Sequence, residues 1–165
     1  MTALELIRAL AHDAAVGIVI TDAMIDLPGP AILYVNDAFG RLVGQPPGNL
    51  IGLSPRFMQG KQTLRSQLDT YHNALTAGVR FHGYLTNYRG DGTMYRAEID
   101  CRPLRAADGR VENFVSFERE VVRRLGRPMT GADGRYVPAS VGDDQIADAL
   151  RSLGVFKHLW NGLQI

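Results

Sequence analysis

Hydrophobic and polar residues follow two different spacings along this chain. Five short runs rich in β-branched and aromatic residues predict strands, and segments with apolar residues at every third or fourth position predict helices. The predicted strands cover residues 16–21, 31–35, 80–88, 94–103 and 111–119. The predicted helices cover residues 2–12, a short segment after Asn36, residues 62–77, and a segment that begins after Asp143 and Asp144.

The helix predicted over 62–77 has the clearest pattern. Leu64, Leu68, Tyr71 and Leu75 form one apolar stripe, and Gly78 is placed to end the helix in a left-handed conformation. The last three strands are separated by glycine-containing turns at 89–92 and 107–109, which is typical of antiparallel hairpins. Hairpins combined with segregated helices predict an α+β fold, with a five-stranded antiparallel sheet and helices on one face.

Composition divides the chain into four parts. We expect an N-terminal flanking helix at 1–13, a folded domain at 14–119, a linker or arm rich in glycine, proline and arginine at 120–142, and a C-terminal helical extension at 143–165.

Charge and cysteine content restrict the function classes. The formal net charge of the 165 residues is +1, so no overall field favours nucleic acid or an anionic membrane. A single cysteine, Cys101, excludes an internal disulfide and favours a reducing compartment, hence a cytoplasmic location. The sequence shows neither a signal-peptide pattern nor an apolar run long enough for a membrane span, so we expect no membrane insertion.

Residues 52–60 carry the most informative motif, Gly-Leu-Ser-Pro-Arg-Phe-Met-Gln-Gly. It resembles the signature of the light-oxygen-voltage (LOV) branch of the PAS domain family, in which a cysteine that forms an adduct with flavin stands where this chain has Pro55. Further phrases similar to that branch are residues 20–22, 34–39 and 87–88. The resemblance covers about residues 14–119 and implies the PAS fold.

The resemblance also implies a ligand pocket. The positions that correspond to flavin-binding residues of the family are Thr21, Ser54, Arg56, Gln59, Asn87 and Glu118. Arg56 matches a phosphate-binding arginine, Gln59 a residue near the ribityl chain, and Asn87 a residue at the pyrimidine edge.

Four positions that correspond to flavin-binding residues depart from the family. Ser54 and Ala97 replace asparagines, His72 replaces an arginine, and Glu118 replaces the glutamine near flavin N5. Each lost polar contact is worth about 0.5–1.5 kcal/mol, so we expect weak FMN binding or no cofactor.

Three side chains allow two interpretations each. Alternation along 111–119 puts Glu118 on one face with Phe114 and Ser116; we favour a carboxylate at the strand end, in solvent or paired with arginine, over a charged pocket residue. We expect Cys101 to pack in the core, with redox sensing as the alternative. His72 is expected at the surface or in weak contact with the pocket, with haem ligation as the alternative.

The outer face of the predicted sheet carries aromatic residues that indicate a docking surface, chiefly Tyr84, Tyr88 and Phe117. We expect a homodimer through this face, or coverage of it by the helix at 2–12. The arginines after the last strand are interpreted as a solvated charged segment rather than a nucleic-acid contact; they are Arg119, Arg123, Arg124 and Arg127. Phe156, Leu159 and Trp160 are either a partner motif or packed on the body.

No phosphate loop, metal-ligand spacing or nucleophilic triad is present in the sequence. We therefore expect a non-enzymatic, single-domain PAS protein of a bacterial-type signalling system. It would act through protein–protein interaction, as a dimer and with a partner such as a histidine kinase. The alternative is an FMN-binding light or redox sensor without adduct chemistry.

Overall fold

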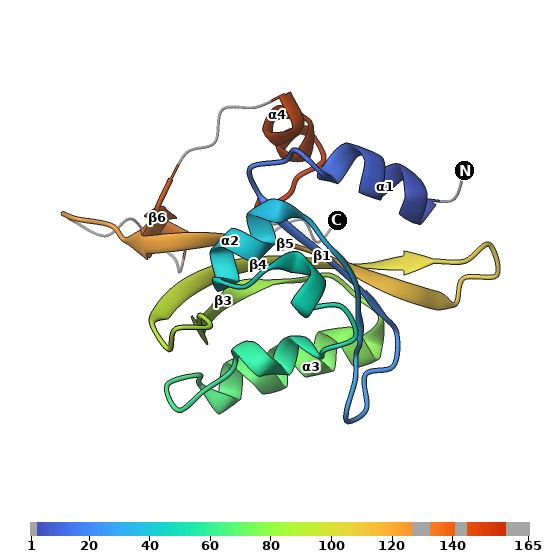
Figure 1. Cartoon of the computed structure of the whole chain (residues 1–165), viewed down its shortest axis with the longest axis horizontal. Helices are drawn as coiled ribbons and strands as arrows, with labels where there is room; N and C mark the ends of the chain where they lie inside the picture. The colour runs from blue at the N-terminus through green and yellow to red at the C-terminus, as the bar shows by residue number, and fades with distance from the viewer. Residues whose placement is uncertain (1–2, 127–132, 141–144, 158–165) are drawn as a thin grey trace, which may run out of the picture.

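The computed structural model describes residues 3–126, 133–140 and 145–157. Its strands form one antiparallel sheet in the order β2-β1-β5-β4-β3, with β6 paired to β5 (Figure 1). The strands are β1 (Gly17–Asp22), β2 (Ile32–Val35), β3 (Phe81–Tyr88), β4 (Met94–Arg105), β5 (Val111–Arg123) and β6 (Tyr136–Pro138). The α-helices are α1 (Ala3–Ala11), α2 (Asp37–Val43), α3 (Arg65–Ala77) and α4 (Gln145–Ser152), and the 3₁₀ turns are η1 (Pro47–Asn49), η2 (Pro55–Met58) and η3 (Asp133–Arg135). The predicted α+β class is confirmed.

Helices cover both faces of the sheet because its strands are apolar on both sides. On β1, Val19 packs with α2 in one cluster, whereas Ile18 and Ile20 pack on the opposite face. The face of the sheet that carries Val19 is called the inner face, and α2 and α3 lie on it. Helices α1 and α4 lie on the outer face, through Ile7 and Ile146 (Figure 1). The inner arrangement matches the prediction, and α1 covers part of the outer face as expected.

Asn36 joins three elements at the start of the domain. Its Oδ1 accepts hydrogen bonds from the N–H groups of Phe39 at 3.0 Å and Ile18 at 2.8 Å, and its Nδ2 donates to the carbonyls of Ala11 and Val16 at 2.9 Å each. The side chain is 1% exposed. It thereby caps α2 and also fixes the end of α1 against β1.

Helix α3 begins later than predicted. Leu68, Tyr71 and Leu75 pack against the core, and Gly78 ends the helix with φ of 64° as expected. Leu64, however, precedes the first helical residue and is 55% exposed. Its assignment to the apolar stripe is wrong because the backbone at Leu64 is extended, which turns its side chain away from the helix face.

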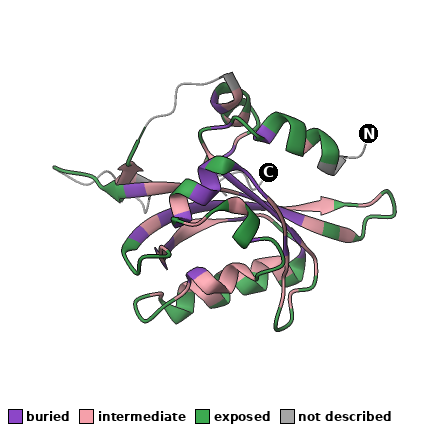
Figure 2. Ribbon diagram, viewed as in Figure 1, coloured by how far each residue is buried: buried purple, intermediate pink, exposed green. Residues whose placement is uncertain are grey.

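The last long strand extends past the predicted end at residue 119. Strand β5 continues to Arg123, and β6 pairs with it within the segment expected to be a linker. The extension forms because Val121 is buried and pairs with Arg96 of β4, so the ladder and the alternation both continue. Figure 2 shows buried residues concentrated in the central strands. Within the described ranges, no helix combines the length and apolar character that a membrane span requires.

Candidate functional site

A cavity of about 430 Å³ lies between the inner face of the sheet, helix α3, turn η2 and the loop after β1. It is lined by every residue that the sequence nominated for a pocket: Thr21, Ser54, Arg56, Gln59, Asn87 and Glu118. Pro55, His72 and Cys101 line it as well. The motif at 52–60 and the distant strands therefore contribute to the same site.

Turn η2 presents the motif to the cavity. Ser54 caps the turn by accepting a hydrogen bond from the Arg56 N–H at 3.3 Å, and Pro55 occupies the first position, where no N–H is needed. The Arg56 Nε–H donates to the Gly29 carbonyl at 3.0 Å, and its Nη2 donates to the Ile25 carbonyl at 3.2 Å. Part of the guanidinium thus anchors the loop after β1 instead of facing a ligand.

The buried end of the cavity is polar at a few points only. Asn87 is 2% exposed, and its Nδ2 lies 4.0 Å from the sulfur of Met58. The Tyr95 hydroxyl also donates to that sulfur, at 3.7 Å. The Thr21 hydroxyl donates a hydrogen bond to the Asp22 carbonyl at 2.9 Å. The Asn87 amide therefore lies beside the Met58 sulfur and interacts with the Tyr95 hydroxyl.

Glu118 lies in the wall of the cavity, which overturns our favoured interpretation of a carboxylate in solvent or paired with arginine. The residue is 3% exposed, and its Oε2 has no hydrogen-bond partner among the described residues. Burial raises the pKa of Glu118 to about 8. The strand continues past residue 119, so Glu118 is not at a strand end, and alternation turns it inward.

Cys101 and its neighbours form a neutral patch beside Glu118. Cys101 belongs to the core cluster, as predicted, and burial raises the pKa of its thiol to about 11. The hydroxyls of Tyr71 and Ser116 lie 3.2 Å apart and share a hydrogen bond. Ala97 is fully buried, whereas His72 is exposed at the cavity mouth. The sequence analysis did not nominate Tyr71 or Ser116 for the pocket, although their spacing already placed them on inward faces.

The three aromatic residues nominated for a docking surface have different surroundings. Tyr84 stacks on Tyr136 of β6 at 4.7 Å between ring centroids. Phe117 packs against the cluster formed with α1 and α4. The Tyr88 hydroxyl accepts a hydrogen bond from the Gln62 N–H at 2.9 Å. Segments of the same chain therefore cover much of this proposed surface.

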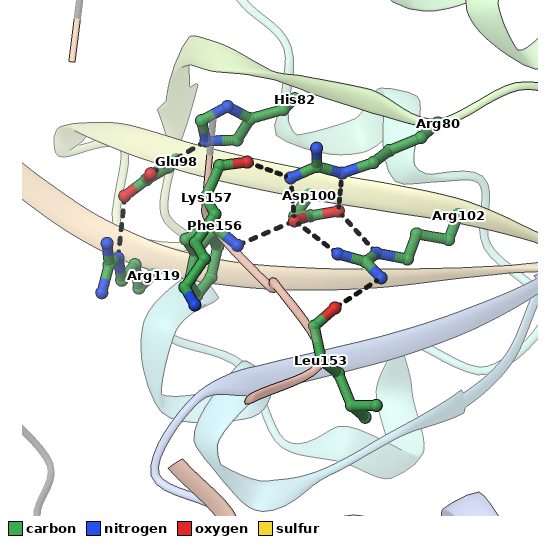
Figure 3. A network of polar contacts seen from close by, with 9 residues as sticks. All are labelled: Arg80, His82, Glu98, Asp100, Arg102, Arg119, Leu153, Phe156 and Lys157. Carbon is green, nitrogen blue, oxygen red and sulfur yellow. Dashed lines mark hydrogen bonds and ion pairs between the residues drawn. The ribbon is translucent and has the colours of Figure 1, made fainter. Parts of the chain in front are cut away.

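On the outer face, β3, β4 and β5 carry a cluster of charged side chains that sequence reasoning missed (Figure 3). Asp100, fully buried, accepts from Arg80 at 3.0 and 2.7 Å and from Arg102 at 3.0 and 3.3 Å. The Phe156 N–H donates to the same carboxylate at 2.8 Å. Burial alone would raise the pKa of Asp100, but these hydrogen bonds lower it to about 2.

The same cluster holds the end of the described chain. Arg80 donates to the Lys157 carbonyl at 2.7 Å, and Arg102 donates to the Leu153 carbonyl at 3.2 Å. The Arg119 guanidinium lies 4.2 Å from the centre of the Phe156 ring. We call this contact the tail clamp: Asp100, Arg80, Arg102 and Arg119 on the sheet, and residues 153–157 on the tail.

Glu98 completes the outer-face cluster. It accepts hydrogen bonds from His82 at 2.9 Å and Arg119 at 2.8 Å, and these outweigh the effect of burial and lower its pKa. Arg119 is therefore paired, while Arg123 and Arg124 are exposed. The predictions for Arg127, Leu159 and Trp160 concern residues outside the described ranges. Alternation along 94–103 could have revealed the cluster, since Glu98 and Asp100 lie on the opposite face of β4 from Ala97, Ile99 and Cys101.

Comparison with known proteins gives related sequences. The bacterioopsin transcriptional activator of Halobacterium salinarum is 33% identical over 113 residues, which cover 68% of this chain and 16% of that protein. The blue-light-activated histidine kinase of Brucella anthropi is 30% identical over 101 residues, covering 61% of this chain and 21% of the kinase. This chain thus spans about a fifth or less of these two relatives.

Solved structures agree with the fold. The light-state structure of the blue-light photoreceptor Aureochrome1 LOV is 34% identical, with a TM-score of 0.61 and coverage of 71% of this chain and 89% of that one. A LOV domain studied with a flavin analogue is 27% identical, with a TM-score of 0.65 and coverage of 72% and 85%. The family model described as PAS domain matches residues 16–123. The chain therefore belongs to the PAS domain family.

Proposed function

We propose that this chain is a non-enzymatic signalling domain that acts through protein–protein interaction and modulates a sensor kinase or another signalling partner. The observation that carries the proposal is the position of the cavity and the tail clamp on opposite faces of the same two strands. Ile99, Cys101 and Glu118 line the cavity, whereas Asp100 and Arg119 belong to the clamp.

This arrangement supports coupling between a ligand and a partner. Side chains alternate along a strand, so a ligand that shifts Cys101 or Glu118 also moves the backbone that carries Asp100 and Arg119. The segment at 153–157 is held by hydrogen bonds between its backbone and the charged side chains of Arg80, Arg102 and Asp100, for which a partner of suitable charge could compete. Occupancy of the cavity would then change how strongly the tail is held.

The chemistry of the cavity favours binding over catalysis. Burial raises the pKa of Cys101 to about 11 and that of Glu118 to about 8, so both groups are protonated at neutral pH. A protonated thiol is a poor nucleophile. Among the described residues, no group of three or more side chains is arranged to hold a metal ion.

The proposal includes a homodimer and a cytoplasmic signalling partner. Tyr84 and Phe117 would contribute to the partner surface once the segments that cover them move. The free, buried thiol of Cys101 is compatible with a reducing compartment. Two relatives, named as a histidine kinase and a transcriptional activator, support a regulatory role.

The test uses the clamp. Affinity capture with cross-linking should be compared between the unaltered chain, Asp100→Asn, and the control Asp108→Asn, whose carboxylate lies in an exposed turn. We expect Asp100→Asn to change the amount of the captured signalling partner several-fold, because the tail competes for the same surface. Equal capture by all three proteins, with the tail released in Asp100→Asn, would contradict the proposal.

The second candidate function is an FMN-binding light or redox sensor without adduct chemistry, since the resemblance of residues 52–60 aligns Pro55 with the reactive cysteine of the LOV branch. Thr21, Gln59 and Asn87 line one cavity, which favours this candidate. They fit the polar edge of a flavin, which would supply light absorption and electron transfer. The carbonyl bonds of Arg56 and the carboxyl of Glu118 weaken the fit.

An absorption spectrum separates the two candidates. The purified chain should be measured as isolated and after reconstitution with excess FMN and removal of free cofactor. Structured flavin bands in the blue region would favour the sensor. A colourless protein that takes up no FMN would exclude the sensor and favour the interaction domain. Neither function depends on cysteine chemistry.

A further inference from the structure

The buried end of the cavity contains an acid whose chemistry the fold leaves incomplete. Glu118 is 3% exposed and lines the cavity, and within the described part of the chain its Oε2 has no hydrogen-bond partner. A polar atom buried in this way costs about 1–3 kcal/mol unless something satisfies it. A molecule that enters the cavity can supply this missing partner.

We propose that the cavity binds a small organic cation, a protonated primary amine attached to an apolar or aromatic body, with the Glu118 carboxylate as its counter-ion. This inference rests on the proposed function, because it names the ligand class of the cavity whose occupancy would control the tail.

The groups around Glu118 provide no competing positive charge. The ionisable side chains that interact with it electrostatically are Tyr71 of α3, and Tyr95 and Cys101 of β4. Burial raises the pKa of each of these three groups above its ordinary value, so all are neutral at pH 7. A cation that balances Glu118 at this end of the cavity therefore has to come from the ligand.

The walls suit the rest of such a molecule. Leu85, Ile99 and Phe114 give the buried end an apolar surface, and Tyr71 adds an aromatic ring that is held by stacking on Phe81 at 4.3 Å. Aromatic rings attract ammonium groups by cation–π interaction. The Tyr71 and Ser116 hydroxyls, 3.2 Å apart, offer further oxygen acceptors for an ammonium N–H.

The charged side chains at the mouth balance in number, so the entrance does not oppose a cation. Its charged lining residues are Asp26, Asp69, Arg56 and Arg65. Arg65 donates to Asp69 at 2.9 Å, and Arg56 donates to two carbonyl oxygens. Arg65 is thus paired with Asp69, while Arg56 keeps its positive charge and is matched in number by the carboxylate of Asp26. An anionic ligand would meet the carboxyl of Glu118 at the far end.

Binding of a cation should release a proton. In the ligand-free protein Glu118 keeps its proton at neutral pH, because burial raises its pKa to about 8. A bound ammonium group favours the ionised carboxylate and lowers that pKa. At pH 7 the complex therefore contains a carboxylate where the free protein contains a carboxylic acid, and the solution gains close to one proton for each ligand bound.

The experiment compares amines with alcohols of the same shape. Phenethylamine and tryptamine, with phenethyl alcohol and tryptophol as neutral counterparts, are titrated into the ¹⁵N-labelled protein at pH 7 and followed by amide chemical shifts. We expect each amine to bind about tenfold more tightly than its alcohol, because a hydrogen bond between two charged groups is the stronger kind. The shifts should centre on β4 and β5 around Cys101 and Glu118.

Two further measurements make the test specific. Calorimetry in buffers with different ionisation enthalpies should show nearly one proton released per amine with the unaltered protein. Glu118→Gln should remove the proton release and the preference for amines, while Glu112→Gln, which changes an exposed glutamate of the same strand, should keep both. The proton count needs no variant, so the test stands even if Glu118→Gln folds poorly.

The outcomes separate this inference from the proposed function. Failure of both amines to bind, or equal binding of amine and alcohol, would overturn the inference and leave the interaction role of the clamp intact. Amine binding with proton release, combined with partner capture that does not depend on the clamp, would retain the ligand class and contradict the proposed function.

Discussion

Glu118 and Asp100 are two buried acids on neighbouring strands, and their environments are opposite. Asp100 lies on the outer face with two arginines and a backbone N–H, and its pKa is lowered to about 2. Glu118 lies on the inner face, where its Oε2 has no partner within the described ranges and its pKa is raised to about 8. Burial is nearly the same, 0% and 3% exposed, so the neighbouring groups decide the protonation state.

The difference assigns separate roles to the two faces. A buried carboxylate that is fully hydrogen-bonded holds its partners in one arrangement, and here it fixes residues 153–157 on the sheet. A buried acid without such bonds stabilises nothing in the free protein and is suited to a ligand. The outer face therefore holds the tail, and the inner face is where we propose that a ligand binds.

The largest expected effect comes from Asp100→Asn, which removes the charge at the centre of the clamp. Arg80 and Arg102 would lose their anionic acceptor, and breaking a buried ion pair from one side costs about 3–5 kcal/mol. We expect a loss of that size in the free energy of unfolding, measured by urea denaturation. Amide hydrogen exchange should show faster exchange at Phe156, whose N–H donates to Asp100.

The control for this variant is Asp108→Asn. Asp108 is exposed and its carboxylate accepts from the Arg110 N–H in a turn, a bond that asparagine can also accept. Its effect should stay within about 0.5 kcal/mol. If Asp100→Asn were equally mild, the clamp would contribute little to holding the tail.

The next effect belongs to Glu118→Gln and depends on pH. The folded protein retains the Glu118 proton up to about pH 8, whereas the unfolded chain loses it near the ordinary value of 4.5. Glu118 therefore lowers stability progressively as pH rises between these two values. Glutamine cannot ionise, so the variant should be more stable than the unaltered protein by about 2–4 kcal/mol at pH 9 and nearly equal to it at pH 4.5.

Urea denaturation at pH 4.5 and at pH 9 measures this difference, with Glu112→Gln as the matched control. Glu112 is exposed, so its removal should give the same small change at both pH values. A stability difference between Glu118→Gln and the unaltered protein that did not grow with pH would show that Glu118 titrates normally.

A smaller effect tests the neutral part of the inner face. Tyr71→Phe removes the hydroxyl that shares a hydrogen bond with Ser116 at 3.2 Å and keeps the ring that stacks on Phe81. A neutral hydrogen bond contributes about 0.5–1.5 kcal/mol, so we expect a loss in that range by thermal or urea denaturation. The double variant Tyr71→Phe with Ser116→Ala should cost no more than the sum. A loss as large as that of Asp100→Asn would erase the contrast between the faces.

Local signals in the sequence predicted the elements well, and the residues nominated for a pocket line one cavity. Asn36 begins helix α2 with its side-chain hydrogen bond, Gly78 ends α3 with its left-handed backbone, and the motif at 52–60 places Arg56 and Gln59 at the cavity. The prediction for Leu64 was wrong because a periodic pattern does not specify the first residue of a helix.

The outer-face cluster could not be predicted in the same way. Asp100 acquires its role from Arg80 and Phe156, which are 20 and 56 residues away in the sequence. Whether a mid-strand acid is exposed, paired or unpaired depends on which segments arrive above it, and β6 and the tail were not anticipated there. Glu118 illustrates the same limit, since its burial depends on β5 continuing beyond residue 119.

The smallest expected effect comes from Arg65→Ala at the cavity mouth. Arg65 forms an arginine–carboxylate ion pair like those of the clamp, but this pair is exposed to water. Arg65 donates to Asp69 at 2.9 Å, but their side chains are 87% and 56% exposed. An exposed pair one helical turn apart contributes about 0.3–0.5 kcal/mol and is screened by salt. Urea denaturation at low and high salt should show a loss of this size that shrinks as salt is added. The distances in this pair and in the clamp are nearly equal, so a loss comparable to that of Asp100→Asn would mean that geometry alone sets the strength of an ion pair. A small, salt-sensitive loss would instead show that exclusion of water gives the outer face its hold on the tail.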